Sequence, residues 1–202
     1  NALQGLKAVA DSSFSQADTI PPRLYCSEEV YGLEMEQIFA KEWVCPGLAA
    51  DIPNAGDFVT FSIGDQPFFV MRGKDGLVRS FSNVCLHRMM PLVEGAGSCK
   101  GKIVCLYHAW TYSTEGSVIG AGHMGGRDPV FDKKQFRLPE LRTELWQGWI
   151  YVTLNAEAPS VASLLAGLLP VVERYQMEGY IPVVQQDHTW DTNWKLLNEN
   201  FM

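Results

Sequence analysis

Two short segments of the chain each carry one cysteine and one histidine. The first holds Cys85 and His87 as Cys-x-His, and the second holds Cys105 and His108 as Cys-x-x-His, with seventeen residues between the segments. Thiolates and neutral imidazoles are both good ligands for transition metals. The chain has only four histidines, so two of them at this spacing are a specific signal. The spacing predicts a metal centre with two sulfur and two nitrogen ligands.

The pairing of the ligands indicates which metal the centre holds. A [2Fe–2S] cluster bound by two cysteines on one iron and two histidines on the other is the Rieske arrangement. A structural zinc site is the first alternative, but zinc fingers usually pair cysteine with cysteine and histidine with histidine. The second alternative is that these are unrelated buried residues, since cysteine is commonly a small apolar side chain. We expect the cluster, with Trp110 covering it from water.

The elements that must position these ligands are short strands. Each ligand pair follows a strand, and loops at strand ends are where a rigid β scaffold can aim side chains at one point. Lys74-Asp75-Gly76 and Thr114-Glu115-Gly116 are turn signals within this region. The predicted strands are Asp57 to Ile63, Pro67 to Arg72, Leu77 to Ser82, Lys102 to Leu106, Thr111 to Ser113 and Ser117 to Ile119.

Outside this region the pattern predicts mainly helices. Residues 1–24 are expected to form a flexible arm, and Ser27 is expected to cap the helix that follows it. The remaining predictions are a helix over Glu28 to Trp43, a loop over 120–135, a strand over Trp146 to Leu154, a helix-like stretch from Ser160 to Tyr175 disturbed at Pro170, a strand over 181–195, and a helix over Trp194 to Met202.

The ligand segments resemble the cluster motif of Rieske-type ring-hydroxylating oxygenases. The family pattern is C-x-H-R-G, about seventeen residues, then C-x-Y-H-G-W, and this chain reads C-L-H-R-M and C-L-Y-H-A-W-T-Y. It departs from the family at Met89 and Ala109, where glycine is usual, and at Leu106, where proline is common. Respiratory Rieske proteins add a loop disulfide and a serine hydroxyl, which are missing here. We therefore expect a potential at the low end of the Rieske range of about −150 to +300 mV.

The last ten residues resemble a second family segment. The stretch Asn193 to Met202 is similar to N-W-K-x-x-x-E-N-F in the large subunits of these oxygenases, where it opens a helix of the catalytic domain. The resemblance implies a mononuclear Fe(II) held by a 2-His-1-carboxylate triad beyond Met202. It also places Asn200 beside that iron as a candidate catalytic residue; otherwise Asn200 is a polar residue on a helix surface.

The expected fold class is α+β. The resemblance implies an antiparallel β Rieske domain with an N-terminal helix, followed by the start of a helix-grip-type α+β catalytic domain. The expected divisions are an N-terminal arm and helix over 1–39, the Rieske [2Fe–2S] domain over 40–155, and the beginning of the catalytic domain over 156–202.

The implied function is that of a terminal oxygenase component, the α subunit of a Rieske mono- or dioxygenase. Electrons from NAD(P)H would arrive through a reductase, a ferredoxin or both, for O2-dependent hydroxylation or oxidative demethylation of a small aromatic or quaternary amine substrate. The family implies a homotrimer, possibly with β subunits, in which His108 contacts the bridging Asp of a neighbour. The alternative is an electron-transfer protein without its own oxygenase site. Substrate, reaction type and electron donor stay open.

Composition excludes several other classes. Apolar residues make up 47% of the 202, and the net charge is −7 without a basic run, so we expect no nucleic-acid or membrane partner. We expect a cytoplasmic protein, because the five cysteines do not form a disulfide framework. Cys26, Cys45 and Cys99 are expected to be unpaired, and His123 and His188 to be ordinary polar residues.

Overall fold

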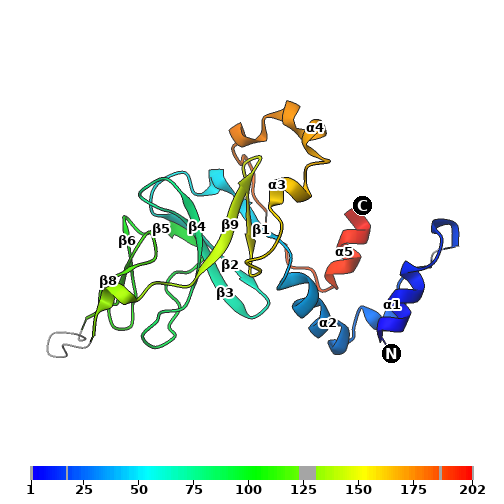
Figure 1. The fold of residues 1–202 in the computed structure, drawn as a ribbon, viewed down its shortest axis with the longest axis horizontal. Coiled ribbons are helices and arrows are strands. Elements are labelled where there is room, and N and C mark those ends of the chain that lie inside the picture. Colours follow the sequence, from blue (N-terminus) through cyan, green and yellow to red (C-terminus); the bar gives the residue numbers. More distant parts are fainter. Residues whose placement is uncertain (1, 17, 123–130, 187, 202) are drawn as a thin grey trace. The chain divides into compact units, whose positions relative to one another are not determined.

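The computed structural model describes residues 2–16, 18–122, 131–186 and 188–201. The chain forms two compact units, one of residues 40–183 and one of residues 1–39 with 184–202. Figure 1 shows the strands in the first unit and the helices α1, α2 and α5 in the second. The α+β class and the antiparallel β domain are confirmed.

The larger unit contains two antiparallel sheets. The first has seven strands in the order β1-β10-β9-β4-β3-β2-β5, and the second has three in the order β6-β7-β8. The strands are β1 Val44–Leu48, β2 Asp57–Ile63, β3 Gln66–Arg72, β4 Val78–Ser82, β5 Ala96–Ser98, β6 Lys102–Val104, β7 Thr111–Ser113, β8 Val118–Gly120, β9 Glu140–Trp146 and β10 Trp149–Thr153.

The core of this unit reaches from the large sheet to both ligand segments. Phe69 on β3 faces Phe81 on β4, their ring centroids are 5.6 Å apart, and neither residue is exposed. The same apolar cluster contains Tyr112 of the small sheet together with Cys85 and Cys105. Burial of aromatic side chains is a large stabilising term, so the packing that stabilises the fold also holds the two cysteines.

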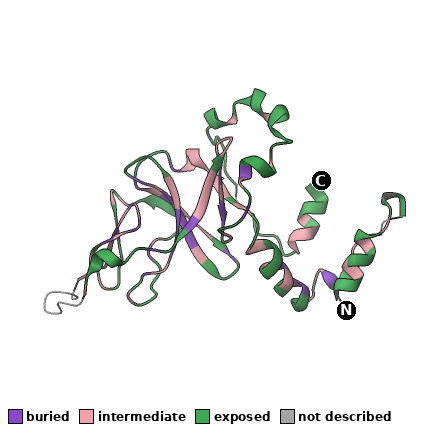
Figure 2. Cartoon of the chain, in the orientation of Figure 1, coloured by how far each residue is buried: buried purple, intermediate pink, exposed green. Residues whose placement is uncertain are grey.

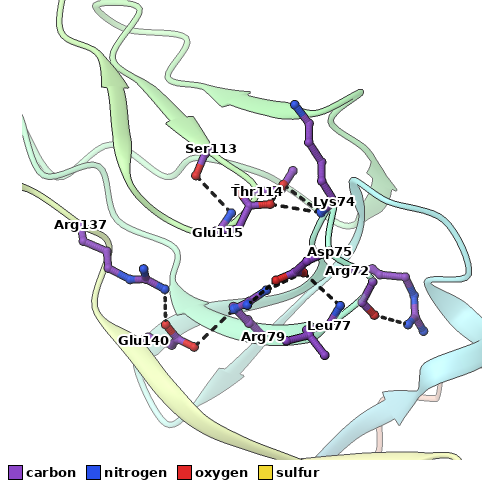
Figure 3. A network of polar contacts seen from close by, with 11 residues as sticks. Arg72, Lys74, Asp75, Leu77, Arg79, Ser113, Thr114, Glu115, Arg137 and Glu140 are labelled. Carbon is purple, nitrogen blue, oxygen red and sulfur yellow. Dashed lines mark hydrogen bonds and ion pairs between the residues drawn. The ribbon is translucent and has the colours of Figure 1, made fainter. Parts of the chain in front are cut away.

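A polar network joins the turn after β3 to the turn after β7 (Figure 3). The backbone N–H of Lys74 donates to Thr114 Oγ1 at 3.3 Å and to Glu115 Oε1 at 3.1 Å. Next to it, Arg79 contacts Asp75 at 2.6 Å, and this hydrogen bond holds the pKa of the Asp75 carboxyl down to about 2. The network fixes the small sheet, which carries Cys105, against the large sheet, which carries Cys85.

Gly116 brings these two sheets into direct contact. It has φ +89°, and a Cβ built on it would lie 2.6 Å from the ring of Phe81. That separation is shorter than real Cβ contacts allow, so only glycine fits at this point of the β7–β8 turn.

Short helices follow the sheets. Residues from 160 onward form α3 Val161–Leu164, α4 Leu169–Val172 and the 3₁₀ turns Glu173–Tyr175 and Met177–Gly179. Figure 2 shows that these helices are almost entirely exposed. Ser160 caps the first of them through its Oγ. The helix-like stretch predicted over Ser160 to Tyr175 is thus two separate turns, interrupted before Pro170.

The smaller unit is helical. It contains α1 Ala2–Ala10, 3₁₀ turns at Phe14–Gln16 and Pro22–Leu24, α2 Glu28–Glu34, a π-helix Met35–Phe39 and α5 Trp194–Phe201. Ser27 caps α2 as expected, because its Oγ accepts from the N–H of Val30 at 3.3 Å. Helix α5 confirms the helix predicted at Trp194.

Four predicted elements are wrong in part. The arm contains helix α1, and the helix predicted to reach Trp43 ends at Phe39, because Val44–Leu48 pairs with β10 instead. The strand predicted from Trp146 is interrupted by a turn at Gln147 and Gly148, both with positive φ. Within the described part of 181–195 there is no strand, because no other strand lies alongside to pair with it. Half of the predicted loop over 120–135, residues 123–130, lies outside the described residues, and its described end contains the 3₁₀ turn Lys133–Gln135.

Candidate metal centre

The two ligand segments fold into turns with the same hydrogen-bond pattern. In the first turn the N–H of Cys85 donates to Met90 O at 2.8 Å, and the N–H of Met89 donates to Cys85 O at 3.0 Å. In the second turn the N–H of Cys105 donates to Trp110 O at 2.8 Å, and the N–H of Ala109 donates to Cys105 O at 2.9 Å. The first turn begins at Cys85, shortly after β4, and the second turn begins at Cys105, directly after β6.

Both turns require a left-handed residue at their fifth position. Met89 has φ 58° and Ala109 has φ 56°, which are the positions where the family pattern has glycine. A left-handed conformation costs a residue with a Cβ roughly 1–2 kcal/mol. The departures from glycine therefore leave the turn geometry intact and add backbone strain beside the ligands.

Asn83 holds the base of the first turn. This residue is 5% exposed, and its Nδ2 donates to Val93 O at 2.8 Å. Its Oδ1 accepts from the N–H groups of Leu92 and Val93, both at 3.1 Å. One buried amide thus ties the start of the loop to its end. Our sequence reasoning missed Asn83, although a polar residue just before a ligand and directly after a strand was a usable signal.

The two predicted cysteine ligands are buried in one cluster, and the two predicted histidine ligands lie beside each other nearer the surface. Cys85 and Cys105 are 1% and 3% exposed, whereas both histidines are half-buried. The ring centroids of His87 and His108 are 4.8 Å apart at 73°, so both imidazoles lie near enough to bind one metal ion. The thiolate side of the centre faces the core, and the imidazole side faces outward.

Trp110 forms a wall beside the imidazoles. Its ring is stacked parallel to that of His87, with centroids 5.2 Å apart and 2° between the planes, and the residue is 3% exposed. Its indole N–H is buried and has no acceptor among the described residues. A buried donor without an acceptor costs free energy, because the group has lost its hydrogen bonds to water. The buried N–H therefore fits a bound group that brings its own acceptors.

Tyr112 lies beneath the centre, and the sequence reasoning missed its role. Its Oη accepts from the N–H of Leu86 at 3.0 Å and lies 3.2 Å from Cys85 Sγ. If Cys85 binds iron as a thiolate, it carries no proton, and the phenol would then be the donor to sulfur. Burial raises the pKa of Tyr112 well above its ordinary value, which keeps the hydroxyl proton in place. The available signal was the alternation of side chains along a strand, which places Tyr112 on the same inward face as Trp110.

The donor set fits a two-iron cluster better than a single metal ion. A structural zinc site needs four ligands around one point. Across the described ranges, no group of three His, Cys, Asp or Glu side chains is placed to hold one metal ion. In a Rieske cluster each iron takes only two protein ligands, one pair of thiolates and one pair of imidazoles. Two buried cysteines and two adjacent imidazoles match that requirement.

Exposed apolar side chains surround the imidazoles. They extend from the same two turns, and the exposed fractions are 37% for Leu86, 81% for Met89, 88% for Leu106 and 57% for Tyr107. Large apolar side chains gathered at one exposed place indicate a surface that contacts another protein. We refer to these four residues as the apolar rim.

The other predicted site residues lie elsewhere in the structure. Asn200 is exposed on the last turn of α5, and His188 is exposed beside Trp190. Cys26, Cys45 and Cys99 are free thiols, as expected. His123 lies outside the described residues. None of the helices in the described ranges is long and apolar enough to cross a membrane.

Comparison with known proteins supports the same assignment. Residues 42–135 match the Rieske [2Fe-2S] domain. The chain is 36% identical over 196 residues to the glycine betaine monooxygenase oxygenase subunit of Pseudomonas aeruginosa, covering 96% of this chain and 45% of that protein. It is 32% identical over 191 residues to the carnitine monooxygenase oxygenase subunit of Escherichia coli, covering 93% and 50%. The chain thus spans about half the length of these curated relatives.

A solved structure agrees in fold. The crystal structure of a quaternary ammonium Rieske monooxygenase in complex with an inhibitor superposes with a TM-score of 0.84 at 29% identity, over 92% of this chain and 52% of that one. The match to the Rieske domain, the two ligand turns and the antiparallel sheets all indicate the same family. The chain belongs to the Rieske oxygenases, and residues 42–135 are its Rieske [2Fe–2S] domain.

Proposed function

We propose that Cys85 and Cys105 bind one iron of a [2Fe–2S] cluster and that His87 and His108 bind the other. The observation that carries this proposal is the pair of turns with matching hydrogen bonds, which places two thiols in the core and two imidazoles 4.8 Å apart. When bound, the cluster supplies one-electron redox chemistry.

The protein's own residues set how that electron moves. Buried thiolates and the wall of Trp110 keep water from the sulfur side, while the half-exposed imidazoles give electrons a route in and out. The apolar rim would exclude water from this route when a partner docks. Tyr112 holds the charge on Cys85 through its hydroxyl donor.

We further propose that the complete polypeptide is the oxygenase component of a Rieske monooxygenase. The expected division into domains at 1–39, 40–155 and 156–202 is retained as part of this proposal. Ligands past Met202 would hold the mononuclear Fe(II) that activates O2, with Asn200 beside it. An NAD(P)H-dependent reductase, alone or with a ferredoxin, would supply the electrons. A cytoplasmic homotrimer, in which His108 contacts the bridging Asp of a neighbour, completes the proposal.

A quaternary amine is the proposed substrate class. The support is that the similar glycine betaine, carnitine and quaternary ammonium monooxygenases carry such substrates in their names. Hydroxylation of an N-methyl group would place one atom of O2 on that carbon, while the other atom leaves as water with two electrons from NAD(P)H. The resulting N-hydroxymethyl ammonium would lose formaldehyde and a proton as its C–N bond breaks, leaving the tertiary amine, so the reaction would be an oxidative demethylation. The residues that would select the substrate lie in the proposed catalytic domain.

Substrate-dependent O2 consumption tests this function. The complete polypeptide is combined with a reductase and NADH, and O2 uptake and formaldehyde are measured with glycine betaine, with carnitine and with naphthalene. We expect uptake and formaldehyde together with one of the two amines. Product formation from naphthalene alone would instead indicate an aromatic oxygenase. Reduction of the cluster with no O2 uptake on any substrate would favour the electron-transfer alternative.

A further inference from the structure

A buried carboxylate from α2 receives two consecutive residues of α5. Glu34 is 7% exposed, its Oε2 accepts from Trp194 Nε1 at 2.9 Å, and its Oε1 lies 2.5 Å from Lys195 Nζ. The Lys195 side chain is itself only 10% exposed. Removing one partner of such a buried ion pair is strongly destabilising, because the other charge is left without compensation.

The π-helix that follows Glu34 carries a second residue, Phe39, that contacts Trp194. Phe39 contacts the Trp194 ring edge-on, with centroids 5.3 Å apart at 78°. On a regular α-helix, residues five apart point about 140° away from each other. The i→i+5 turn of Met35–Phe39 brings such residues to one face. The wider turn directly after Glu34 is therefore compatible with both Glu34 and Phe39 reaching Trp194.

Tyr25 fixes α5 at two further points. Its carbonyl oxygen accepts from Asn193 Nδ2 at 2.9 Å, just before α5 begins. Its hydroxyl donates to Glu199 Oε1 at 2.8 Å, one residue before Asn200. The contacts from the N-terminal segment therefore reach from the first turn of α5 to the turn that carries Asn200.

We infer that Glu34 is a positioning residue that sets the register of α5 and, through it, the place of Asn200 beside the catalytic iron. The part concerning the iron rests on the function proposed above. A buried ion pair generally adds little net stability over a well-packed apolar pair, but in some proteins buried polar or ionic groups favour one arrangement over others. Two acceptor oxygens that match two consecutive donors select one register of the helix.

Hydrogen exchange on the complete polypeptide tests the positioning itself. Glu34→Gln leaves the Lys195 ammonium buried without its counter-charge, so we expect the backbone amides of 195–201 to exchange at least tenfold faster. Amides of β2 to β4 in the other unit should keep their rates. The matched control is Glu36→Gln, on the same segment but exposed, which should change neither set. Unchanged exchange in Glu34→Gln would overturn the inference.

Two further variants keep the test decisive if Glu34→Gln does not fold. Trp194→Phe removes only one donor and keeps the ring contact with Phe39, so we expect a smaller acceleration of a few fold in the same amides. Glu34→Gln with Lys195→Met removes the orphaned ammonium and should slow the exchange again relative to Glu34→Gln or, if that variant does not fold, restore a folded protein. Wild-type rates in Trp194→Phe would contradict the inference.

The iron environment supplies the second readout. Nitric oxide bound to a mononuclear Fe(II) gives an EPR signal whose shape reports the surroundings of the iron. We expect Glu34→Gln to alter this shape while the EPR signal and potential of the Rieske cluster stay the same, and Glu36→Gln to alter neither. An unaltered nitrosyl signal despite faster exchange would refute the link to the iron. A wild type with no nitrosyl signal would instead refute the proposed function, and the exchange result would still decide the role of Glu34.

Discussion

At the scale of single residues, the centre combines cysteines and histidines at the spacing of the family motif with two non-glycine residues in left-handed conformations. The motif predicted the four ligands from their types and spacing, and the structure places both cysteines in one buried cluster and the two imidazoles 4.8 Å apart. The sequence also shows the departures from glycine at Met89 and Ala109. The backbone strain that follows from them became visible only in the structure, because only the φ angles identify both residues as left-handed. Asn83 and Tyr112 were missed because their roles depend on hydrogen bonds across 10 and 27 residues of sequence.

Tyr112→Phe should lower the reduction potential of the cluster. The reduced cluster is more negative, so it benefits more from the hydroxyl donor at Cys85 Sγ. Losing a preference of about 1 kcal/mol for the reduced state corresponds to roughly 40 mV for a one-electron couple. An EPR-monitored redox titration measures the shift. A potential equal to that of the wild type would mean that the phenol does not donate to the ligand sulfur.

Ala109→Gly should increase the free energy of unfolding. Glycine adopts the φ of 56° found here without the Cβ penalty, so we expect a gain of about 1 kcal/mol. Ala162→Gly, at an exposed position of α3, is the control and should instead lose up to about 1 kcal/mol. Denaturant unfolding of both variants, monitored by circular dichroism, gives the comparison. A loss of stability in Ala109→Gly would contradict the strain assigned to this turn.

At the scale of secondary structure, local patterns predicted what local chemistry decides. Strands β2 to β4 were predicted because their apolar alternation and the turns between them depend only on residues that are adjacent in the sequence. The sequence predicted a helix up to Trp43 and no strand over Val44–Leu48, because only the pairing of β1 with β10, more than a hundred residues away, makes this segment a strand. The reverse error was made over 181–195, where a strand-like sequence has no strand beside it among the described residues.

Gly116→Ala should be more damaging than an ordinary turn substitution. The new methyl group would meet the Phe81 ring at 2.6 Å in addition to the positive-φ strain, so we expect a loss of about 2–4 kcal/mol. Gly76→Ala is the matched control, since its φ of +81° is similar but nothing lies within 4 Å. It should lose only about 1 kcal/mol. An equal decrease in the free energy of unfolding of the two variants would show that the contact with Phe81 adds no destabilisation.

At the scale of the whole molecule, the Rieske domain is the part of the proposed oxygenase that would carry electrons. The fold positions the centre by joining two sheets, through the apolar core on one side and the network of Figure 3 on the other. The relatives extend over about twice this length, which is where the proposed second iron and the substrate site belong. The function proposed for the whole protein therefore depends first on the identity of the cluster.

Pulsed EPR of the dithionite-reduced protein tests that identity most directly. If Cys85, His87, Cys105 and His108 hold a Rieske cluster, the spectrum will show two strongly coupled nitrogen nuclei, one from each imidazole, and metal analysis will give two irons per chain for the cluster, in addition to the proposed mononuclear iron of the complete polypeptide. A reduced [2Fe–2S] signal with no coupled nitrogen, or stoichiometric zinc in place of iron, would contradict the account.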